Sequence, residues 1–277
     1  MAVNNVQKYY EVVSKIVDRT GELIRNRIFA AKTIQTKASN IDFVTETDKE
    51  VECMIINGLK TEFPDHKFIG EETAAETNMP LVLTDEPTWI IDPVDGTLNF
   101  VHGNPHVCTS IGLYINKKPE LGLIDVPIMK FRFTAMQGQG AKLNGKPIKV
   151  SGVKELSEAL ICLEGGNDPA LQKRQSVIDN YSTFLPLVHG VRTYGSAAFS
   201  LAAVAMGATD MYMEYGPHIW DMAAGYVILQ EAGGVLIDPA GGPIDLMSCR
   251  MLAASSPELA AEAASKFKQY YPKRDDA

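Results

Sequence analysis

The sequence has little cysteine, and its cysteines show no spacing typical of a zinc site or a redox pair. The four residues, Cys53, Cys108, Cys162 and Cys249, form neither a CxxC motif nor a Cys/His ligand pattern. We therefore expect free thiols in a reducing compartment. The sequence also lacks a signal peptide and an apolar run of membrane-spanning length, so we expect a cytoplasmic protein with no membrane partner.

Basic residues are few and dispersed. The 26 lysines and arginines are outnumbered by 34 acidic residues, which gives a formal net charge of −8. A nucleic-acid-binding protein needs a basic face, so we expect no nucleic-acid partner. An acidic protein that binds an anionic substrate needs cations to reverse the local field.

No internal repeat, low-complexity segment or long linker divides the chain. Its 277 residues, 45% of them hydrophobic, are enough for one domain of two closely packed lobes spanning residues 1–277. Helices and strands are mixed without strict alternation, which favours a layered α+β fold.

Hydrophobic spacing predicts the individual elements. We expect helices at residues 4–31, 45–63, 168–184, 197–206, 221–232 and 257–270. We expect strands at residues 67–70, 89–92, 107–115, 121–127, 159–163, 235–238 and 251–254, and a meander over residues 130–150 that turns at Asn144 and Gly145. Thr47 and Glu50 have the spacing of a capping box for the second helix.

The most informative segment, residues 89–97, places two carboxylates three residues apart after a short apolar strand. Pro93 should end that strand because proline has no amide donor. Asp92, Asp95 and the Val94 carbonyl can then face one hard divalent cation, while the amides of Gly96 and Thr97 can face an anion if a helix begins there. The alternative is an Asp-Gly turn between two strands, but the residues that follow lack the alternating polarity of a hairpin.

Three other segments supply acidic residues near predicted element ends. Glu71 and Glu72 follow an apolar run and could equally form a solvated acidic loop. Asp221 stands at the start of a predicted helix, where an N-cap is the commonest reason for aspartate. The segment at residues 42–48 contains Asp42, Glu46 and Asp48, and its only role could be to cap the second helix.

Taken together, these motifs resemble the signature of the lithium-sensitive, magnesium-dependent phosphatase superfamily, and within it the inositol monophosphatases of the animal type. The motifs are Glu71-Glu72, Asp92-Pro93-Val94-Asp95-Gly96-Thr97, Trp220-Asp221 and Gly233-Gly234. Supporting segments lie at residues 84–97, 99–102, 188–190, 231–236, 241–243 and 245–248. The resemblance spans nearly the whole chain and implies a layered αβαβα sugar-phosphatase fold and a homodimer.

The resemblance also implies a role for each matching position. A first Mg²⁺ would be held by Glu71, Asp92 and the Val94 carbonyl, a second by Asp92, Asp95 and Asp221, and a third, weaker one near Glu71. The catalytic residues would be Glu71, Thr97 and Asp48, with Thr97 and Asp48 orienting the attacking water. The substrate-binding residues would be Asp95, Gly96, Thr97, Ala197, Glu214 and Asp221, and Lys37 matches a basic residue near the metal loop.

Three positions depart from the pattern of the animal enzymes. Gly166 stands where they commonly have a serine near the substrate ring, Leu98 replaces a usual threonine or serine, and Ile219 replaces a cysteine found in some relatives. None is a metal ligand, but Gly166 leaves the recognition of the ring hydroxyls open.

The expected activity is magnesium-dependent hydrolysis of inositol monophosphates. Two cations about 3.5–4 Å apart can stabilise both the attacking and the leaving oxygen of an in-line displacement by water. The alternatives within the superfamily are another sugar-phosphate phosphatase, a bisphosphatase or a 3′-phosphonucleotide phosphatase. An alternative of a different class is a regulatory binding protein on this fold, against which the complete set of acidic ligands weighs.

Overall fold

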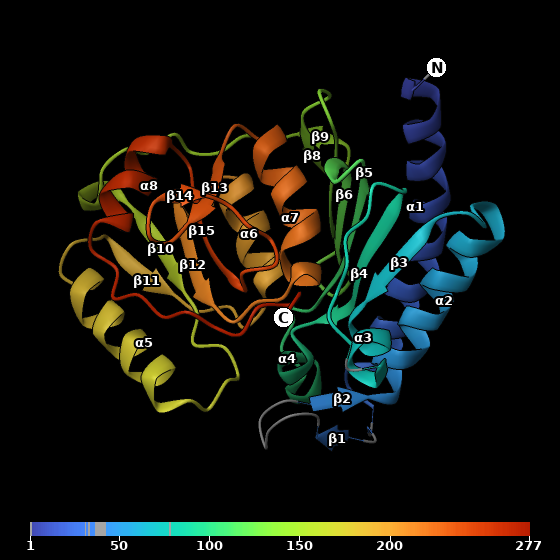
Figure 1. Ribbon diagram of the computed structural model, residues 1–277, viewed down its shortest axis with the longest axis horizontal. Helices are drawn as coiled ribbons and strands as arrows, with labels where there is room; N and C mark the ends of the chain where they lie inside the picture. The colour runs from blue at the N-terminus through green and yellow to red at the C-terminus, as the bar shows by residue number, and fades with distance from the viewer. Residues whose placement is uncertain (1, 31, 33, 37–42, 78) are drawn as a thin grey trace.

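The elements of the chain stack in five alternating layers of helix and sheet (Figure 1). The computed structural model describes residues 2–30, 32, 34–36, 43–77 and 79–277. Two helices lie between two β-sheets, and further helices cover the outer face of each sheet. The predicted αβαβα arrangement is therefore confirmed.

The seven-stranded sheet has the order β3-β4-β5-β6-β7-β8-β9. Only β3 and β4 pair in parallel; the other neighbours are antiparallel. Its strands are β3 (Lys67–Gly70), β4 (Thr88–Asp95), β5 (Cys108–Ile115), β6 (Lys118–Val126), β7 (Phe131–Met136), β8 (Ala141–Leu143) and β9 (Lys146–Pro147). The turn between β8 and β9 has positive φ at Asn144 and Gly145, as a tight hairpin requires.

The six-stranded sheet has the order β11-β10-β12-β15-β13-β14 and mixes parallel and antiparallel pairs. Its strands are β10 (Leu160–Leu163), β11 (Gly190–Arg192), β12 (Met211–Tyr215), β13 (Val235–Asp238), β14 (Gly242–Pro243) and β15 (Arg250–Ala254). A separate antiparallel pair joins β1 (Ile34–Thr36) to β2 (Phe43–Thr45).

Helices form the remaining layers (Figure 1). The outer face of the seven-stranded sheet is covered by α1 (Ala2–Arg27) and α2 (Glu46–Glu62), and that of the six-stranded sheet by α5 (Leu171–Phe184) and α8 (Pro257–Ala264). The central layer holds α6 (Ala197–Ala205) and α7 (Ile219–Glu231). Short helices α3 (Glu71–Thr77) and α4 (Thr97–His102) follow β3 and β4, and η1 (Leu156–Glu158) is a single 3₁₀ turn.

The composition of each helix matches its layer. In α7 nine of the 13 residues are buried, because a helix between two sheets needs apolar side chains on both of its sides. The outer helix α1 buries one stripe, which includes Val13, Val17 and Ile24. Its other face is polar, as expected for a helix with solvent on one side.

Several sequence predictions need correction. The first helix ends at Arg27 rather than residue 31, and the last ends at Ala264 rather than residue 270. The capping box of α2 is formed by Thr45 and Asp48, not by Thr47 and Glu50. The sequence did not predict α3, β1, β2, β11 or β12, all of them short segments with little periodicity, and it gave α4 only as a condition of the phosphate site.

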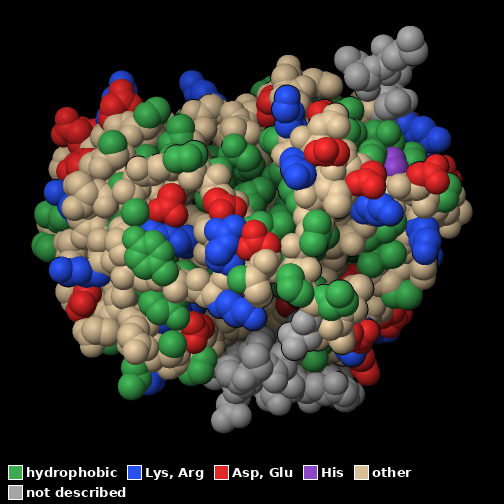
Figure 2. Space-filling model, viewed as in Figure 1, with side chains coloured by type: hydrophobic (Ala, Val, Ile, Leu, Met, Phe, Trp, Pro, Cys, Tyr) green, Lys and Arg blue, Asp and Glu red, His purple; other side chains and the backbone are tan. Residues whose placement is uncertain are grey.

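The surface carries charges of both signs. On the face shown in Figure 2, lysine and arginine side chains are interspersed with acidic ones rather than gathered into one basic region. Within the described residues, no helix is both long and apolar enough to span a membrane.

Two paired glycines allow α7 to lie directly on the seven-stranded sheet. Gly112 of β5 is opposite Gly122 of β6. A Cβ atom on Gly122 would come within 2.4 Å of the Ala224 carbonyl oxygen, and one on Gly112 within 3.0 Å of the Ala223 Cβ. Neither backbone can move aside cheaply, so these two positions fix the distance between helix and sheet.

We expect Gly122→Ala to destabilise the protein by about 1–3 kcal/mol, because the added methyl group overpacks a backbone contact. Urea unfolding monitored by circular dichroism measures the change. Gly242→Ala is the matched control, since a Cβ there meets nothing within 4 Å. Equal stability of the two variants would show that the sheet or α7 can move apart to accept a methyl group at position 122.

Candidate active site

Three carboxylates from two elements converge in the interior of the protein. Asp92 and Asp95 lie near the end of β4, and Asp221 lies in the first turn of α7. One oxygen from each lies within 4.8 Å of the other two. Asp92 and Asp95 are only 2% and 7% exposed. Such a cluster is a candidate site for a hard cation, because oxygen ligands from carboxylates are those that magnesium prefers.

The end of β4 is shaped by an irregular register rather than by a break at Pro93. The strand continues through Asp95, and its pairing with β5 shifts between Asp92 and Asp95. Thr109 donates to the Pro93 carbonyl oxygen (2.9 Å), and the Val94 amide donates to Asp92 Oδ1 (3.0 Å). The prediction that Pro93 ends the strand is wrong, because proline at a bulge costs no ladder hydrogen bond.

A helix begins directly after this strand, as the phosphate-site interpretation required. Gly96 precedes α4 with φ of 87°, a conformation that favours glycine. A side chain there would also clash with the His106 carbonyl oxygen at 2.9 Å. The Thr97 hydroxyl lies 3.0 Å from Asp48 Oδ1 and 3.2 Å from the Val94 carbonyl oxygen.

Asp48 is fully buried at the start of α2. Its Oδ2 atom accepts hydrogen bonds from the amide and the hydroxyl of Thr45. Burial raises the pKa of Asp48 to about 6, opposed by the bonds from Thr45 and increased further by the charge of Glu71. Asp48 thus bonds to Thr45, the N-cap of α2, through one oxygen and to the Thr97 hydroxyl through the other. It is also close enough to Glu71 for the two negative charges to repel each other.

Glu71 is placed by the start of α3. The carboxylate of Glu52 in α2 accepts the amides of Glu72 and Thr73, both at 2.8 Å, and so caps α3 from outside. Glu52 was not among the predicted site residues, although a glutamate on the buried face of a predicted helix indicates a hydrogen-bond partner inside the protein. Glu71 and Glu72 therefore begin a helix rather than a solvated loop, and Glu72 is 4% exposed.

The like charges of this cluster oppose one another. Burial, and then the charges of Glu71, Asp95 and Asp221, raise the pKa of Asp92 well above its ordinary value of 3.8. Burial and neighbouring acids likewise raise the pKa of Asp221. The cluster is poor at holding several negative charges without a cation, which is the usual electrostatic mark of a metal site.

Asp95 also anchors the start of α6. Its Oδ2 atom accepts from the Ser196 hydroxyl (2.5 Å) and the Ala198 amide (2.7 Å), and Oδ1 accepts from the Ala197 amide (3.2 Å). These bonds oppose the effect of burial, which nevertheless raises the pKa of Asp95 to about 6. Ser196 was missed in the sequence, although serine before a predicted helix is a strong N-cap signal.

Asp221 is not the N-cap of α7 but its third residue. The helix begins at Ile219, and the backbone amide of His218 donates to Asp221 Oδ2 (2.6 Å). This bond fixes the carboxylate toward Asp92 and Asp95.

A second acidic region adjoins α6. Glu214 of β12 is 8% exposed, and its Oε2 atom accepts from the Tyr212 hydroxyl. Burial and the charge of Glu164 raise the pKa of Glu214 to about 7. Glu164, also missed in the sequence, accepts the amides of Tyr194 and Gly195, just before α6. Asp95 adds to the shift of Glu164, so the two acidic regions are electrostatically connected.

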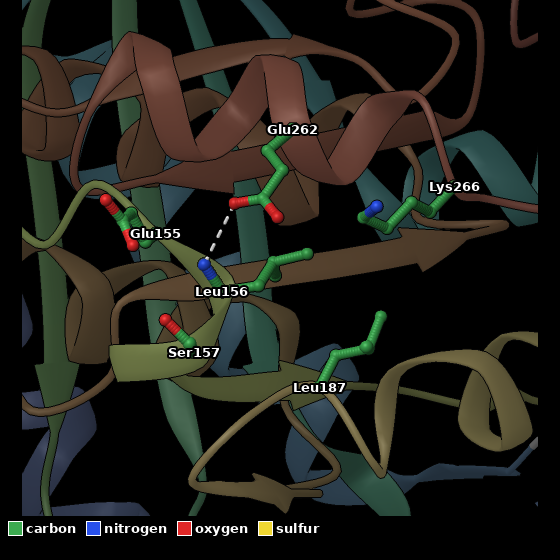
Figure 3. A pocket seen from close by; sticks show the side chains of 6 residues that line it. All are labelled: Glu155, Leu156, Ser157, Leu187, Glu262 and Lys266. Atoms are coloured by element: carbon green, nitrogen blue, oxygen red, sulfur yellow. Dashed lines mark hydrogen bonds between the residues drawn. The ribbon is translucent and has the colours of Figure 1, made fainter.

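A surface pocket elsewhere in the protein lacks such a group of converging carboxylates. A pocket of about 320 Å³ lies between η1, α8 and the segment after α5 (Figure 3). Its lining residues are Glu155, Leu156, Ser157, Leu187, Glu262 and Lys266. The Glu262 carboxylate in this pocket accepts a hydrogen bond from the Leu156 amide (3.0 Å). The converging carboxylates therefore mark the better candidate for an active site. Lys37, predicted near the metal loop, lies outside the described residues.

Comparison with known proteins adds independent findings. Residues 5–271 match the inositol monophosphatase family. The chain is 42% identical to inositol monophosphatase 2 of Homo sapiens over 100% of this chain and 96% of that protein, and 45% identical to inositol monophosphatase 3 of Solanum lycopersicum over 92% and 96%. Among solved structures, extragenic suppressor protein suhB of Bartonella henselae matches with a TM-score of 0.82 at 28% identity, over 97% of this chain and 99% of that one.

We expect Asp92→Asn to stabilise the metal-free protein at neutral pH by about 0.5–2 kcal/mol. Because the folded-state pKa of Asp92 is raised, its ionisation opposes folding increasingly as the pH rises above 3.8, and asparagine removes that cost. The same variant should lose most of the stabilisation that added Mg²⁺ gives the native protein. Thermal unfolding with EDTA and with Mg²⁺ measures both effects. A variant that is less stable without metal, yet equally stabilised by Mg²⁺, would contradict this account.

Proposed function

The chain belongs to the inositol monophosphatase family, and on that premise we propose that it hydrolyses inositol monophosphates to inositol and phosphate with magnesium. As a member of the family it is a phosphoric monoester hydrolase. The observation that carries the proposal is the convergence of Asp92, Asp95 and Asp221 within 4.8 Å, at the point where β4 passes into α4.

The residues present fit magnesium. They offer carboxylate oxygens that repel one another in a buried site, and a divalent cation would offset both the repulsion and the burial. We assign a first ion to Glu71, Asp92 and the Val94 carbonyl, and a second to Asp92, Asp95 and Asp221, with a third near Glu71. Bound magnesium would neutralise phosphate charge and activate water for attack.

The protein's own groups then hold the phosphate and the water. The backbone amides of Gly96 and Thr97 donate hydrogen bonds to the phosphate oxygens at the turn into α4. The Thr97 hydroxyl lies between Asp48 Oδ1, which accepts its hydrogen bond, and the Val94 carbonyl oxygen, and Thr97 and Asp48 together orient the attacking water. Glu71 holds the same water from α3. Water attacks phosphorus directly, so no phosphorylated side chain forms.

The alcohol part of the substrate contacts the second acidic region. We assign ring-hydroxyl contacts to Glu214, to the Ala197 amide and to the outer oxygens of Asp95 and Asp221. Acidic acceptors suit hydroxyl donors, whereas a second phosphate needs a basic pocket. Two carboxylates, Glu164 and Glu214, lie here with the single ammonium group of Lys173, so the region offers no net positive charge for a second phosphate.

Other properties follow from family membership and belong to the same proposal. Lithium would bind at the second site, where its single charge would stabilise a leaving alkoxide less well than the double charge of magnesium. The protein works as a cytoplasmic homodimer and as a single domain.

A panel of substrates with Mg²⁺ tests the assignment. We expect kcat/KM for inositol 1-phosphate or inositol 4-phosphate to exceed that for fructose 1,6-bisphosphate and adenosine 3′,5′-bisphosphate by at least about tenfold. A bisphosphate would place its second phosphate in the acidic region, whereas a monophosphate has no second phosphate. Phosphate release measures each rate. Asp92→Asn, expected to lose at least about a hundredfold, excludes contaminating phosphatases. A larger kcat/KM for either bisphosphate would place the chain elsewhere in the superfamily. Release by the native protein no faster than by Asp92→Asn would favour a binding role.

A further inference from the structure

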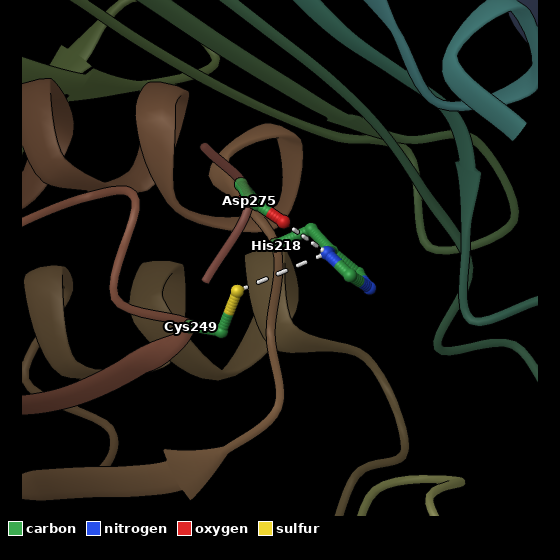
Figure 4. A group of neighbouring side chains, drawn as sticks. All are labelled: His218, Cys249 and Asp275. Carbon is green, nitrogen blue, oxygen red and sulfur yellow. Dashed lines mark hydrogen bonds and ion pairs between the residues drawn. The ribbon is translucent and has the colours of Figure 1, made fainter. Parts of the chain in front are cut away.

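A second cluster of possible metal ligands lies beside the first residue of α7 (Figure 4). It contains His218, which precedes α7, Cys249, which precedes β15, and Asp275 near the end of the chain. Asp275 Oδ1 lies 2.6 Å and Cys249 Sγ lies 4.0 Å from His218 Nδ1. All three ligand atoms lie within 4.8 Å of one another. Sequence spacing gave no sign of this cluster because its members lie 26 or more residues apart in sequence, on three segments.

Backbone contacts hold the three segments in place. Asp275 Oδ2 accepts the Ile219 amide (2.9 Å), and the Asp275 amide donates to the Met247 carbonyl oxygen (3.0 Å). Cys249 has φ of 55°, an uncommon conformation for a residue with a side chain. Such conformations persist where surrounding contacts enforce them, often at functional sites.

The donor set differs from that of the carboxylate centre. It offers one nitrogen, one sulfur and one oxygen, which are the ligands that zinc takes in proteins. In a tetrahedral zinc site, neighbouring ligand atoms lie about 3.3–3.8 Å apart, within the spread seen here. Cys249 and the Asp275 side chain are buried, whereas the His218 side chain is 49% exposed. The exposed histidine leaves access for the ion and for water as a fourth ligand.

We propose that His218, Cys249 and Asp275 form a binding site for zinc or a similar transition-metal cation, separate from the magnesium centre. Zinc displaces the thiol proton of Cys249 and the proton shared by His218 and Asp275, and both protons pass to solvent. The ion would join the C-terminal segment to the start of the helix that carries Asp221. Magnesium does not compete, since it prefers an all-oxygen site.

Cobalt is the probe, added to the full-length protein in excess Mg²⁺ so that the carboxylate centre is filled. We expect a near-ultraviolet thiolate-to-cobalt absorption band, visible bands typical of tetrahedral Co²⁺, and loss of both when Zn²⁺ is added. Cys249→Ser should abolish the thiolate band, while Cys53→Ser, which alters an exposed free cysteine, should keep it. Asp275→Asn should weaken Co²⁺ binding at least about tenfold. Circular dichroism confirms that each variant is folded.

Absence of the thiolate band in the native protein would overturn the proposal, as would an unchanged band in folded Cys249→Ser. In either case the three side chains serve only to hold the C-terminal segment against α7.

Lys173 of α5 is a buried lysine, only 1% exposed. Burial lowers the pKa of Lys173, and the charges of Glu214 and Asp168 oppose that effect, so the ammonium group interacts with both carboxylates. A Cβ atom on Gly166 would lie 2.4 Å from Lys173 Nζ and 3.1 Å from Glu214 Oε1. The ammonium group and the carboxylate thus face the same small space, which a serine at position 166 would fill.

Resting on the proposed function, we infer that Lys173 is a specificity-determining residue. It donates to one hydroxyl oxygen of the substrate ring while Glu214 accepts from the neighbouring hydroxyl, so that the pair recognises a vicinal diol. A lysine and a glutamate together add no net charge, which suits a neutral polyol. Gly166 is required because the lysine occupies the place of the usual side chain.

We expect Lys173→Met to lower the ratio of kcat/KM for inositol 1-phosphate to kcat/KM for p-nitrophenyl phosphate, which has no hydroxyl, by at least about tenfold. Arg174→Met, on the exposed face of the same helix, is the charge-matched control and should keep the native ratio. An unchanged ratio in folded Lys173→Met would overturn the inference. If the proposed function itself is wrong, the native protein will not prefer inositol 1-phosphate to p-nitrophenyl phosphate. That result differs from an unchanged ratio in the variant, so the two failures can be told apart.

Discussion

Repulsion among buried carboxylates is the constraint on which the site depends. Asp92, Asp95 and Asp221 are brought together from a strand end and a helix start, and each has a raised pKa. The fold accepts this cost because neutral donors hold each group: the Val94 amide, the Ser196 hydroxyl and the His218 amide. These donors orient the carboxylates without cancelling their charge, and so leave the charge available to a cation.

The sequence predicted most of the long helices and strands, and the acidic segment at residues 89–97, because apolar periodicities and local motifs are visible in it. Asp92, Asp95, Gly96 and Thr97 are neighbours in the chain, and a strand followed by a helix start could be inferred there. The five-layer order came from family resemblance, since periodicity alone does not say which sheet a strand joins. The roles given to the site residues stay predictions; what the structure adds is their placement.

What the sequence could not provide are contacts between distant segments. Glu52 caps α3 across about twenty residues, and Lys173 of α5 lies beside Gly216, which follows β12 much later in the chain. The cluster of His218, Cys249 and Asp275 joins three segments whose spacing matches no motif. The errors at Pro93 and at the capping box have a similar cause, because a bulge and a cap are decided by single hydrogen bonds that composition does not encode.

The paired glycines beneath α7 have a consequence for the choice of ion. Because backbone rather than flexible side chains separates α7 from the sheet, the gap between Asp221 and the end of β4 cannot widen without lifting the helix. Calcium binds oxygen at about 2.3–2.6 Å and magnesium at about 2.0–2.1 Å. We therefore expect a rigid gap to favour the smaller ion, with the backbone at two glycines setting the distance between the carboxylates of α7 and β4.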